Sequence, residues 1–320
     1  MSAKETVAII DVGSNSIKML IACKGAKGNA IESVYKETLE TRISAGISQQ
    51  NPTLTEASIE AGVQSIQKLV ATARDYNSAN IKIVATSAVR DATNGTEFTQ
   101  RVAETTGVPL TILSGIEEAA YIVKGLRCDP LISKMNRFIQ MDIGGGSLEL
   151  IDFNNGATQQ ACSLQLGAVR LTERFINDRT TAISKEAEAQ IAHHVTAELS
   201  ASGFEFGSAA IPMIGTGGAL FIAKAVINKT AQTQLSTLSK ADVVKLQEQL
   251  GSLTLAERKS IPGLPTARAD ILPTGLITVR AVLDYADRDT LVCSSYNLRY
   301  GVAAELLSFS TAVTLQRVAE

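Results

Sequence analysis

A pattern that begins with aspartate occurs twice in this chain, and it constrains the fold more than any other feature of the sequence. It reads Asp, aliphatic, Gly, two variable residues, Ser, aliphatic, charged and two aliphatic residues. The two copies span residues 11–20 and 142–151. Each copy follows an apolar stretch, 7–10 or 138–141, and leads into another. Such a sequence predicts a strand, a tight turn and a second strand, so the chain contains two hairpins of one design.

The residue types of both turns are suited to binding phosphate. Glycine lets the backbone approach a ligand closely and direct N–H groups toward it. Serine and asparagine add short hydrogen-bond donors. A single glycine-rich hairpin is usually only a hairpin, but the recurrence of Asp, Gly and Ser in register favours phosphate binding. We therefore expect two lobes that grip one phosphorylated ligand from opposite sides. The predicted phosphate-binding residues of the two turns are Ser14, Asn15, Ser16, Gly144, Gly145, Gly146 and Ser147.

Composition is that of an ordinary globular protein with an aliphatic core. The 320 residues suffice for about two domains, and 45% of them are hydrophobic. A net charge of −2 gives no overall attraction to a nucleic acid polymer or an acidic membrane. No apolar run reaches membrane-spanning length, and no signal peptide precedes the first strand. The four cysteines form no Cys-x-x-Cys pair, so we expect free thiols in a cytoplasmic protein.

Strands alternate with helices through both halves of the chain, which predicts two α/β lobes with mixed sheets. The first lobe is predicted to contain strands at 7–11, 17–23, 31–39, 81–85 and 110–113, and helices at 54–76, 97–106 and about 116–124, the last ended by Gly125. The second is predicted to contain strands at 138–142, 147–153, 159–166, 212–215 and 291–293, and helices at 184–200, from 219, at 239–250, at 271–286 and from 302. Thr55, Ser184 and Ser239 are predicted N-caps. We expect domains at 1–125 and 126–320, with the last helix, about 302–320, packing back on the first lobe.

Several motifs in a fixed order extend the pattern over nearly the whole chain. They lie at 11–16, 85–94, 114–119, 142–147, 163–173, 215–219, 268–276 and 297–302. In these motifs the chain resembles the exopolyphosphatase/guanosine pentaphosphate phosphohydrolase family, within the actin–Hsp70–sugar kinase superfamily. The resemblance implies two ribonuclease-H-like lobes with a cleft between them. The chain departs from the family pattern at Leu148, where Thr is common, and at Tyr300, where an acidic residue is usual. It also stops after the two core lobes, so the resemblance implies that the helical accessory domains of longer members are missing.

The reaction that the resemblance implies is hydrolysis of a terminal phosphoanhydride, which rests on positioning, charge neutralisation and an activated water. The only histidines, His193 and His194, lie in a predicted helix, so a carboxylate is the remaining candidate for the base. Adjacent helical residues point about 100° apart, so one of Glu117 and Glu118 faces the ligand. The family pattern selects Glu118, and Glu117 would then support the helix start or a salt bridge.

Two arginines are further candidates for phosphate contact. Arg90 follows the buried strand at 81–85, and its guanidinium suits phosphate, although an ion pair with Asp91 is the alternative. Arg42 resembles a family arginine near the phosphates. The Gly-Thr-Gly-Gly run at 215–218 lies where superfamily members contact adenosine, and it either binds a nucleotide or only preserves the fold.

Carboxylates beside the turns are the candidate metal ligands. Asp142 ranks first because it directly precedes the triple glycine, Glu149 ranks second, and Asp11 ranks third as an outer-shell ligand through water. Mg²⁺ takes one or two carboxylates together with phosphate oxygens and keeps several waters. The alternative for Asp142 is a turn-capping aspartate.

The combined expectation is an Mg²⁺-dependent exopolyphosphatase that acts on inorganic polyphosphate, with short chains preferred. Hydrolysis of guanosine pentaphosphate at the same residues is the nearest alternative. A phosphotransferase of the superfamily and a catalytically silent polyphosphate or nucleotide sensor are more remote. The family resemblance also implies a homodimer.

Overall fold

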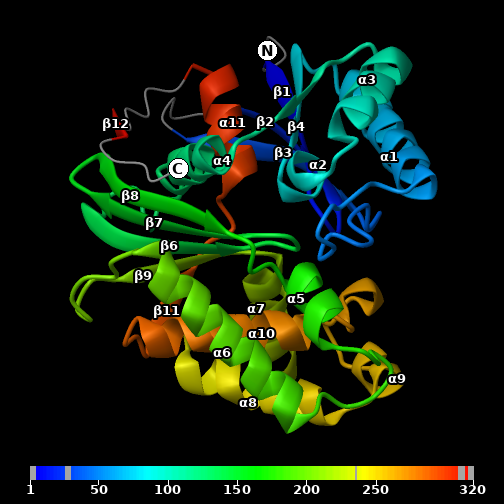
Figure 1. Cartoon of the computed structure of the whole chain (residues 1–320). Coiled ribbons are helices and arrows are strands. Elements are labelled where there is room, and N and C mark those ends of the chain that lie inside the picture. The colour runs from blue at the N-terminus through cyan, green and yellow to red at the C-terminus, as the bar shows by residue number, and fades with distance from the viewer. Residues whose placement is uncertain (1–4, 26–29, 235, 309–313, 316–320) are drawn as a thin grey trace. The chain divides into compact units, whose positions relative to one another are not determined.

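The computed structural model describes residues 5–25, 30–234, 236–308 and 314–315. The chain divides into two compact units, each an α/β structure built on a mixed sheet (Figure 1). The first unit comprises Met1–Met135 and Tyr296–Thr314, and the second comprises Asn136–Ser295 and Leu315–Glu320. The first unit is therefore assembled from two separate stretches of the sequence. Our division of the chain at residue 125 stays a prediction.

In the described part of the chain, the sheet of the first unit has five strands in the order β3-β2-β1-β4-β5. The strands are β1 (Thr6–Val12), β2 (Ile17–Lys24), β3 (Ile31–Leu39), β4 (Asn80–Ala85) and β5 (Leu110–Ile112). β1, β2 and β3 form an antiparallel meander, and β4 and β5 continue the sheet in parallel. β1 and β2 are buried on both faces, which explains their continuous apolar sequence.

Helices of the first unit pack around this sheet in two pairs, α1 with α3 and α4 with α11. The helices are α1 (Glu56–Asp75), α2 (Ser87–Asp91), α3 (Gly95–Thr106), α4 (Gly115–Leu126) and α11 (Leu298–Leu306). The Thr55 side chain accepts from the N–H of Ser58, so the predicted N-cap is confirmed.

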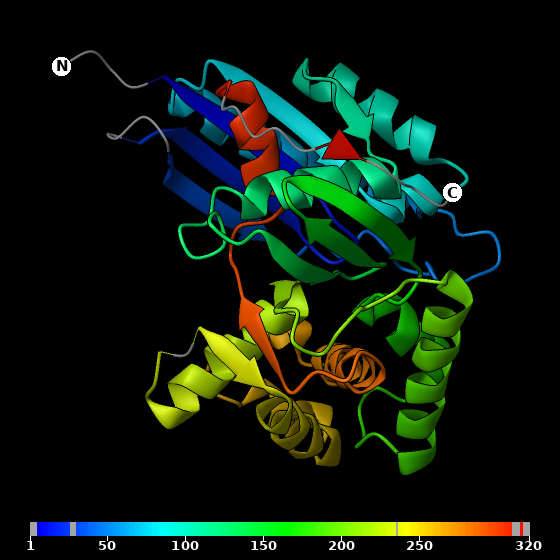
Figure 2. The same ribbon diagram turned by 90° about the vertical axis from the view of Figure 1, so that its left-hand side faces the viewer.

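α4 and α11 approach so closely that glycine is required on both helices. The two lie side by side in both views (Figures 1 and 2). A Cβ at Gly125 would lie 2.1 Å from the carbonyl oxygen of Asn297, and a Cβ at Gly301 would lie 1.9 Å from that of Tyr121. We predicted that Gly125 ends the helix, and this was wrong. Gly125 instead lies inside α4, at a backbone contact. α11 includes Gly301 at this contact. It begins at Leu298, earlier than the predicted residue 302.

Among the residues that the structure describes, the sheet of the second unit has seven strands in the order β10-β11-β9-β6-β7-β8-β12. The strands are β6 (Arg137–Ile143), β7 (Leu148–Asn154), β8 (Ala157–Leu164), β9 (Met213–Gly217), β10 (Thr237–Ser239), β11 (Thr290–Cys293) and β12 (Thr314–Leu315). Its central order β8-β7-β6-β9-β11 repeats the first sheet, with the same antiparallel meander and the same parallel continuation. The prediction of two ribonuclease-H-like α/β lobes is confirmed at the level of the fold.

The core of the second unit lies between its sheet and its helices. The helices are α5 (Ala168–Phe175), α6 (Lys185–Ser202), α7 (Gly218–Ala231), α8 (Lys240–Ser252), α9 (Leu255–Lys259) and α10 (Leu272–Tyr285), with a 3-10 turn at Thr266–Arg268. α10 packs against α5, α6, α7 and α8, and Leu276, Val279 and Leu283 are fully buried in it. The predicted N-caps Ser184 and Ser239 are both confirmed. Sequence periodicity did not indicate α2, α5, α9 or β10, which are too short to show it.

The structure also bears on the predictions about the cysteines and about membrane-spanning segments. All four cysteines are free, as predicted. Within the described ranges, no helix combines the length and apolar character needed to cross a membrane.

Candidate active site

The two glycine-containing turns have the same backbone design. Residues 13–16 link β1 to β2, with Val12 paired to Ile17, and residues 144–147 link β6 to β7, with Ile143 paired to Leu148. In each turn the N–H of the first glycine donates to the carbonyl oxygen of the serine, over 3.2 Å in the first and 3.0 Å in the second. The repeat seen in the sequence is thus a repeat of turn geometry.

The first turn is tied to its surroundings through side chains. Ser14 Oγ lies 3.0 Å from Ser87 Oγ, at the start of α2. The amide of Asn15 donates to Glu40 Oε2 over 2.7 Å and accepts from Arg42 Nε over 3.1 Å. Both polar atoms of Asn15 therefore have partners in the protein, which fixes the direction of its side chain. Arg42 itself has a φ of 45°, a backbone conformation that is uncommon for a residue other than glycine.

The second turn is backed by the start of α5. Gly167 lies so close that a Cβ there would be 2.3 Å from the carbonyl carbon of Gly146 and 2.4 Å from that of Gly145. The N–H of Ala168 donates to the carbonyl oxygen of Gly144 over 3.0 Å. Because the first N–H groups of a helix have no partner inside the helix, these contacts also satisfy α5.

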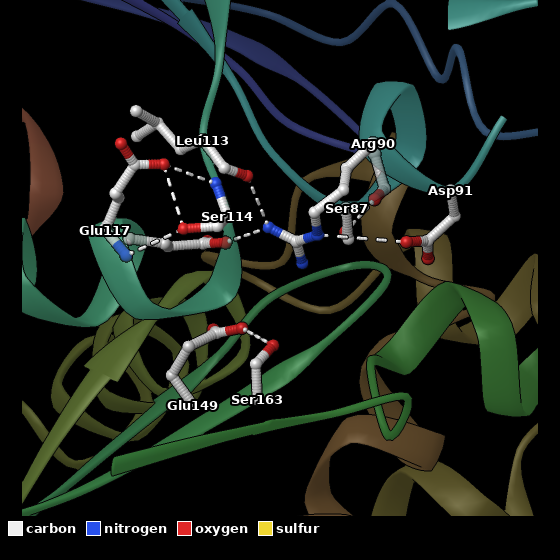
Figure 3. Close-up of polar contacts among 10 residues, drawn as sticks. Ser87, Arg90, Asp91, Leu113, Ser114, Glu117, Glu149 and Ser163 are labelled. Carbon is white, nitrogen blue, oxygen red and sulfur yellow. Dashed lines mark hydrogen bonds and ion pairs between the residues drawn. The ribbon is translucent and has the colours of Figure 1, made fainter. Parts of the chain in front are cut away.

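The two adjacent glutamates at the start of α4 have different surroundings. Glu117 closes a capping box with Ser114, accepting from both its N–H and its hydroxyl over 2.8 Å (Figure 3). The hydrogen bonds from the Ser114 backbone and hydroxyl lower the pKa of Glu117. Glu118 is 8% exposed and accepts from Arg90 Nη1 over 2.9 Å. Glu117 thus supports the helix start, as one of our alternatives had it.

The contacts of Arg90 in the first unit include Leu113, Glu118 and Asp91. Its Nη1 donates to the carbonyl oxygen of Leu113 over 3.0 Å as well as to Glu118. Its Nε lies 3.8 Å from Asp91 Oδ1 (Figure 3). The ion pair with Asp91, which was the alternative to a site role, is therefore present but is the longer contact. The shorter contact joins the two residues that the sequence predicts as catalytic.

Asp142 and Glu149 lie directly opposite each other on β6 and β7. Both are buried, at 9% and 1% exposure. Thr216 Oγ1 donates to Asp142 Oδ2 over 2.5 Å, and Ser163 Oγ donates to Glu149 Oε1 over 2.8 Å (Figure 3 shows the second). Like charges in directly opposite positions repel, so this pair is suited to a cation.

Asp11, the third predicted metal ligand, has a different environment. It occupies the same register position in the first hairpin, where its opposite residue is Lys18 instead of an acid. Its Oδ2 lies 4.0 Å from Arg299 Nε. In the part of the chain that the structure describes, no three His, Cys, Asp or Glu side chains cluster as a metal site. A magnesium ion that shares phosphate oxygens needs only one or two carboxylates from the protein.

Some contacts of the site could not be read from the sequence. Thr216 reaches Asp142 because β9 runs parallel to β6 with these two residues paired. Gly217 has a φ of 98°, and a Cβ there would lie 2.8 Å from Asp142 Oδ1. The Gly-Thr-Gly-Gly run therefore supports Asp142.

His194 packs against Phe175 with ring centroids 5.4 Å apart, and burial lowers the pKa of the histidine.

The chain is similar to known proteins in sequence and in fold. The model of the Ppx/GppA phosphatase family matches residues 20–309. A solved exopolyphosphatase from Cytophaga hutchinsonii is 21% identical, with a TM-score of 0.85 over 95% of this chain and 98% of that one. An exopolyphosphatase-like protein is 23% identical, with a TM-score of 0.83 over 95% and 98% of the two chains. The Ppx/GppA family member of Aquifex aeolicus is 22% identical, with a TM-score of 0.77 over 96% and 99%. These structures share the fold of the chain.

Proposed function

Because this chain belongs to the Ppx/GppA phosphatase family and is a phosphoanhydride hydrolase, we propose that its substrate is inorganic polyphosphate. The enzyme would remove the terminal phosphate from short chains with the help of Mg²⁺. The proposal includes a cytoplasmic location, which suits four free thiols. It also includes a homodimer, an expectation taken from the family resemblance.

The observation that carries the proposal is the contact between Glu118 and Arg90. Glu118 is a buried carboxylate held in one orientation over 2.9 Å, whereas its neighbour Glu117 is engaged in the capping box. A carboxylate in this position can accept a proton from water while the water oxygen attacks the terminal phosphorus. The bond to the bridging oxygen then breaks, and the shortened chain leaves. Arg90 has further N–H groups that suit a phosphate oxygen.

The remaining residues would bind the substrate. In the first unit, Ser14 and Ser16 would donate to phosphate oxygens, with Asn15 contributing its backbone N–H. In the second unit, the N–H groups of the glycine-rich turn and the hydroxyl of Ser147 would do the same.

Asp142 and Glu149 would hold the metal. The fit rests on two buried carboxylates in opposite positions, each steadied by a hydroxyl donor. When bound, Mg²⁺ would neutralise the charge on the phosphate oxygens. Thr216 would keep Asp142 in position by donating to one oxygen.

A phosphate-release assay tests the proposal directly. Purified protein is supplied with Mg²⁺ and, separately, with tripolyphosphate, long-chain polyphosphate, guanosine pentaphosphate or ATP. We expect the highest kcat/KM for tripolyphosphate and no release after Glu118→Gln substitution. A higher kcat/KM for guanosine pentaphosphate would make that nucleotide the substrate and would leave the assignment of the site residues unchanged. Equal activity of wild type and the Glu118→Gln variant would overturn the assignment of the base.

A further inference from the structure

Both turns are backed by the chain segment that follows the third strand of their own sheet. In the first unit this segment follows β3, and the N–H of Arg42 donates to the carbonyl oxygen of Asn15 over 2.9 Å. In the second unit it follows β8, and the N–H of Arg170 donates to the carbonyl oxygen of Gly145 over 3.2 Å. Ser44 in the first unit and Val169 in the second add equivalent bonds, of 3.2 and 2.8 Å.

An arginine in each segment also binds the third residue of its turn. Arg42 Nε donates to Asn15 Oδ1 over 3.1 Å, and Arg170 Nε donates to the carbonyl oxygen of Gly146 over 2.9 Å. Asn15 and Gly146 occupy the same place in the repeated pattern. Arg42 was predicted from the sequence as a phosphate ligand, whereas Arg170 was given no role. Both arginines thus contact the third residue of their turn, Arg42 through the side chain of Asn15 and Arg170 through the main chain of Gly146.

These contacts determine which way the N–H groups of the turns point. A peptide unit is planar and trans, so the carbonyl of one residue and the N–H of the next point in opposite directions. In the second turn the carbonyls of Gly144, Gly145 and Gly146 all accept from α5 or from Arg170. The N–H groups of Gly145, Gly146 and Ser147 are therefore directed away from α5. A guanidinium behind the carbonyls also offsets their negative partial charge, which leaves the N–H side of the turn more attractive to an anion.

We propose that Arg170 is a positioning residue that holds the peptides of the second phosphate turn with their N–H groups toward the ligand, and that Arg42 positions the first turn through the side chain of Asn15. The inference rests on the proposed function, since it concerns how the same turns bind phosphate. Arg170 acts from the carbonyl side of the turn through Gly146. Arg42 acts through the side-chain oxygen of Asn15, and so its contribution to phosphate binding is through the turn.

The test measures phosphate binding and turnover of the full chain with Arg170→Gln, Arg170→Lys and Arg42→Gln substitutions. Arg280→Gln is the matched control, because Arg280 belongs to the same unit as Arg170 and pairs with Glu188 on α6. Pyrophosphate is titrated into ¹⁵N-labelled protein while the amide signals of Gly145, Gly146 and Ser147 are followed. KM and kcat for tripolyphosphate are measured on the same samples.

We expect Arg170→Gln to raise KM about tenfold to a hundredfold, the range for losing one hydrogen bond from a charged group. The amide signals of the turn should shift in wild type and in the control, and much less in this variant. Arg42→Gln should raise KM in the same way, and Arg170→Lys should restore part of the affinity. A purely structural role would lower the folded fraction and the apparent kcat but leave KM of the folded molecules unchanged.

The outcomes separate this inference from the proposed function. If Arg170→Gln is unfolded by its amide spectrum, Arg170→Lys decides, and a wild-type KM in that variant overturns the inference. A wild-type KM and wild-type shifts in a folded Arg170→Gln variant also overturn it. If wild type binds pyrophosphate through the turn but hydrolyses no polyphosphate, the substrate proposal fails and the positioning role stands.

Discussion

Replacement of Gly167 by alanine should disable the second phosphate turn through a single methyl group. A Cβ at this position would lie 2.3 Å from the carbonyl carbon of Gly146, whereas ordinary contacts begin at 3.4 Å. The difference, 3.4 − 2.3, requires a displacement of about 1.1 Å between two backbone segments. The atoms that would clash with the new methyl group are backbone atoms and not the end of a flexible side chain, so the turn itself must move.

The magnitude follows from two effects of that displacement. Overpacking of this kind costs about 1–3 kcal/mol of stability. A displacement of about 1 Å in a group that positions substrate can lower the rate by about 10²-fold. We therefore expect the Gly167→Ala variant to remain folded but to lose kcat/KM for tripolyphosphate by about two orders of magnitude.

The assay is phosphate release measured beside thermal unfolding, with Gly251→Ala as the control. A Cβ at Gly251, in α8, meets no atom within 4 Å. Alanine is favoured over glycine in a helix by about 0.5–1 kcal/mol, so the control should be slightly more stable and fully active. Wild-type kcat/KM in a folded Gly167→Ala variant would refute the reasoning, because the turn would then have moved without consequence.

Three further predictions concern single carboxylates. Glu118→Gln cannot accept a proton, so turnover should fall by about 10²–10⁴-fold while tripolyphosphate binding persists. Glu117→Gln retains a capping-box acceptor, so its turnover should fall less. If kinetics on both variants showed the larger loss at Glu117, the assignment of Glu118 as the base would be reversed. Asp142→Asn removes an anionic oxygen at nearly constant volume, so the Mg²⁺ concentration for half-maximal activity should rise, and an unchanged Mg²⁺ titration would exclude Asp142 as a ligand. For Glu305, burial raises the pKa, but hydrogen bonds led by that from Lys124 outweigh it and hold the pKa at about 2, below the ordinary 4.5. Its stabilising contribution is therefore complete above pH 4.5 and is lost as pH falls toward 2, so chemical denaturation of wild type and Glu305→Gln across this window should show converging stabilities. A difference that stayed constant with pH would contradict the role of the charge.

The features that the sequence predicted are those written in local patterns. The repeated Asp-Gly-Ser pattern predicted two hairpins of one design, because glycine and alternating strand signals act over a few residues. Thr55, Ser184 and Ser239 were identified as N-caps for the same reason. Glu118 was selected by family resemblance and Arg90 by its position after a buried strand, and the structure adds the hydrogen bond between them.

The features that the sequence missed depend on partners far along the chain. Thr216 reaches Asp142 only because β6 and β9 pair in parallel, and nothing in either segment encodes that register. Arg170 lies in a motif that the resemblance includes, but its role appears only when α5 is seen against the second turn. Gly125 was read as a helix stop because glycine commonly follows a helix end, whereas here it serves a contact with Asn297.

The contact between α4 and α11 bears on the order in which the chain folds during synthesis. Glu118 lies in the first turn of the helix that carries Gly125, and the partner helix contributes Asn297 and Gly301 to the contact. A ribosome must therefore release residues 136–295 of the second unit before the helix of the candidate base has its packing partner. Domains usually fold in the order in which they are made. In this chain residues 136–295 of the second unit can fold while the first unit still lacks α11, so the helix of the candidate base gains this packing partner late in folding.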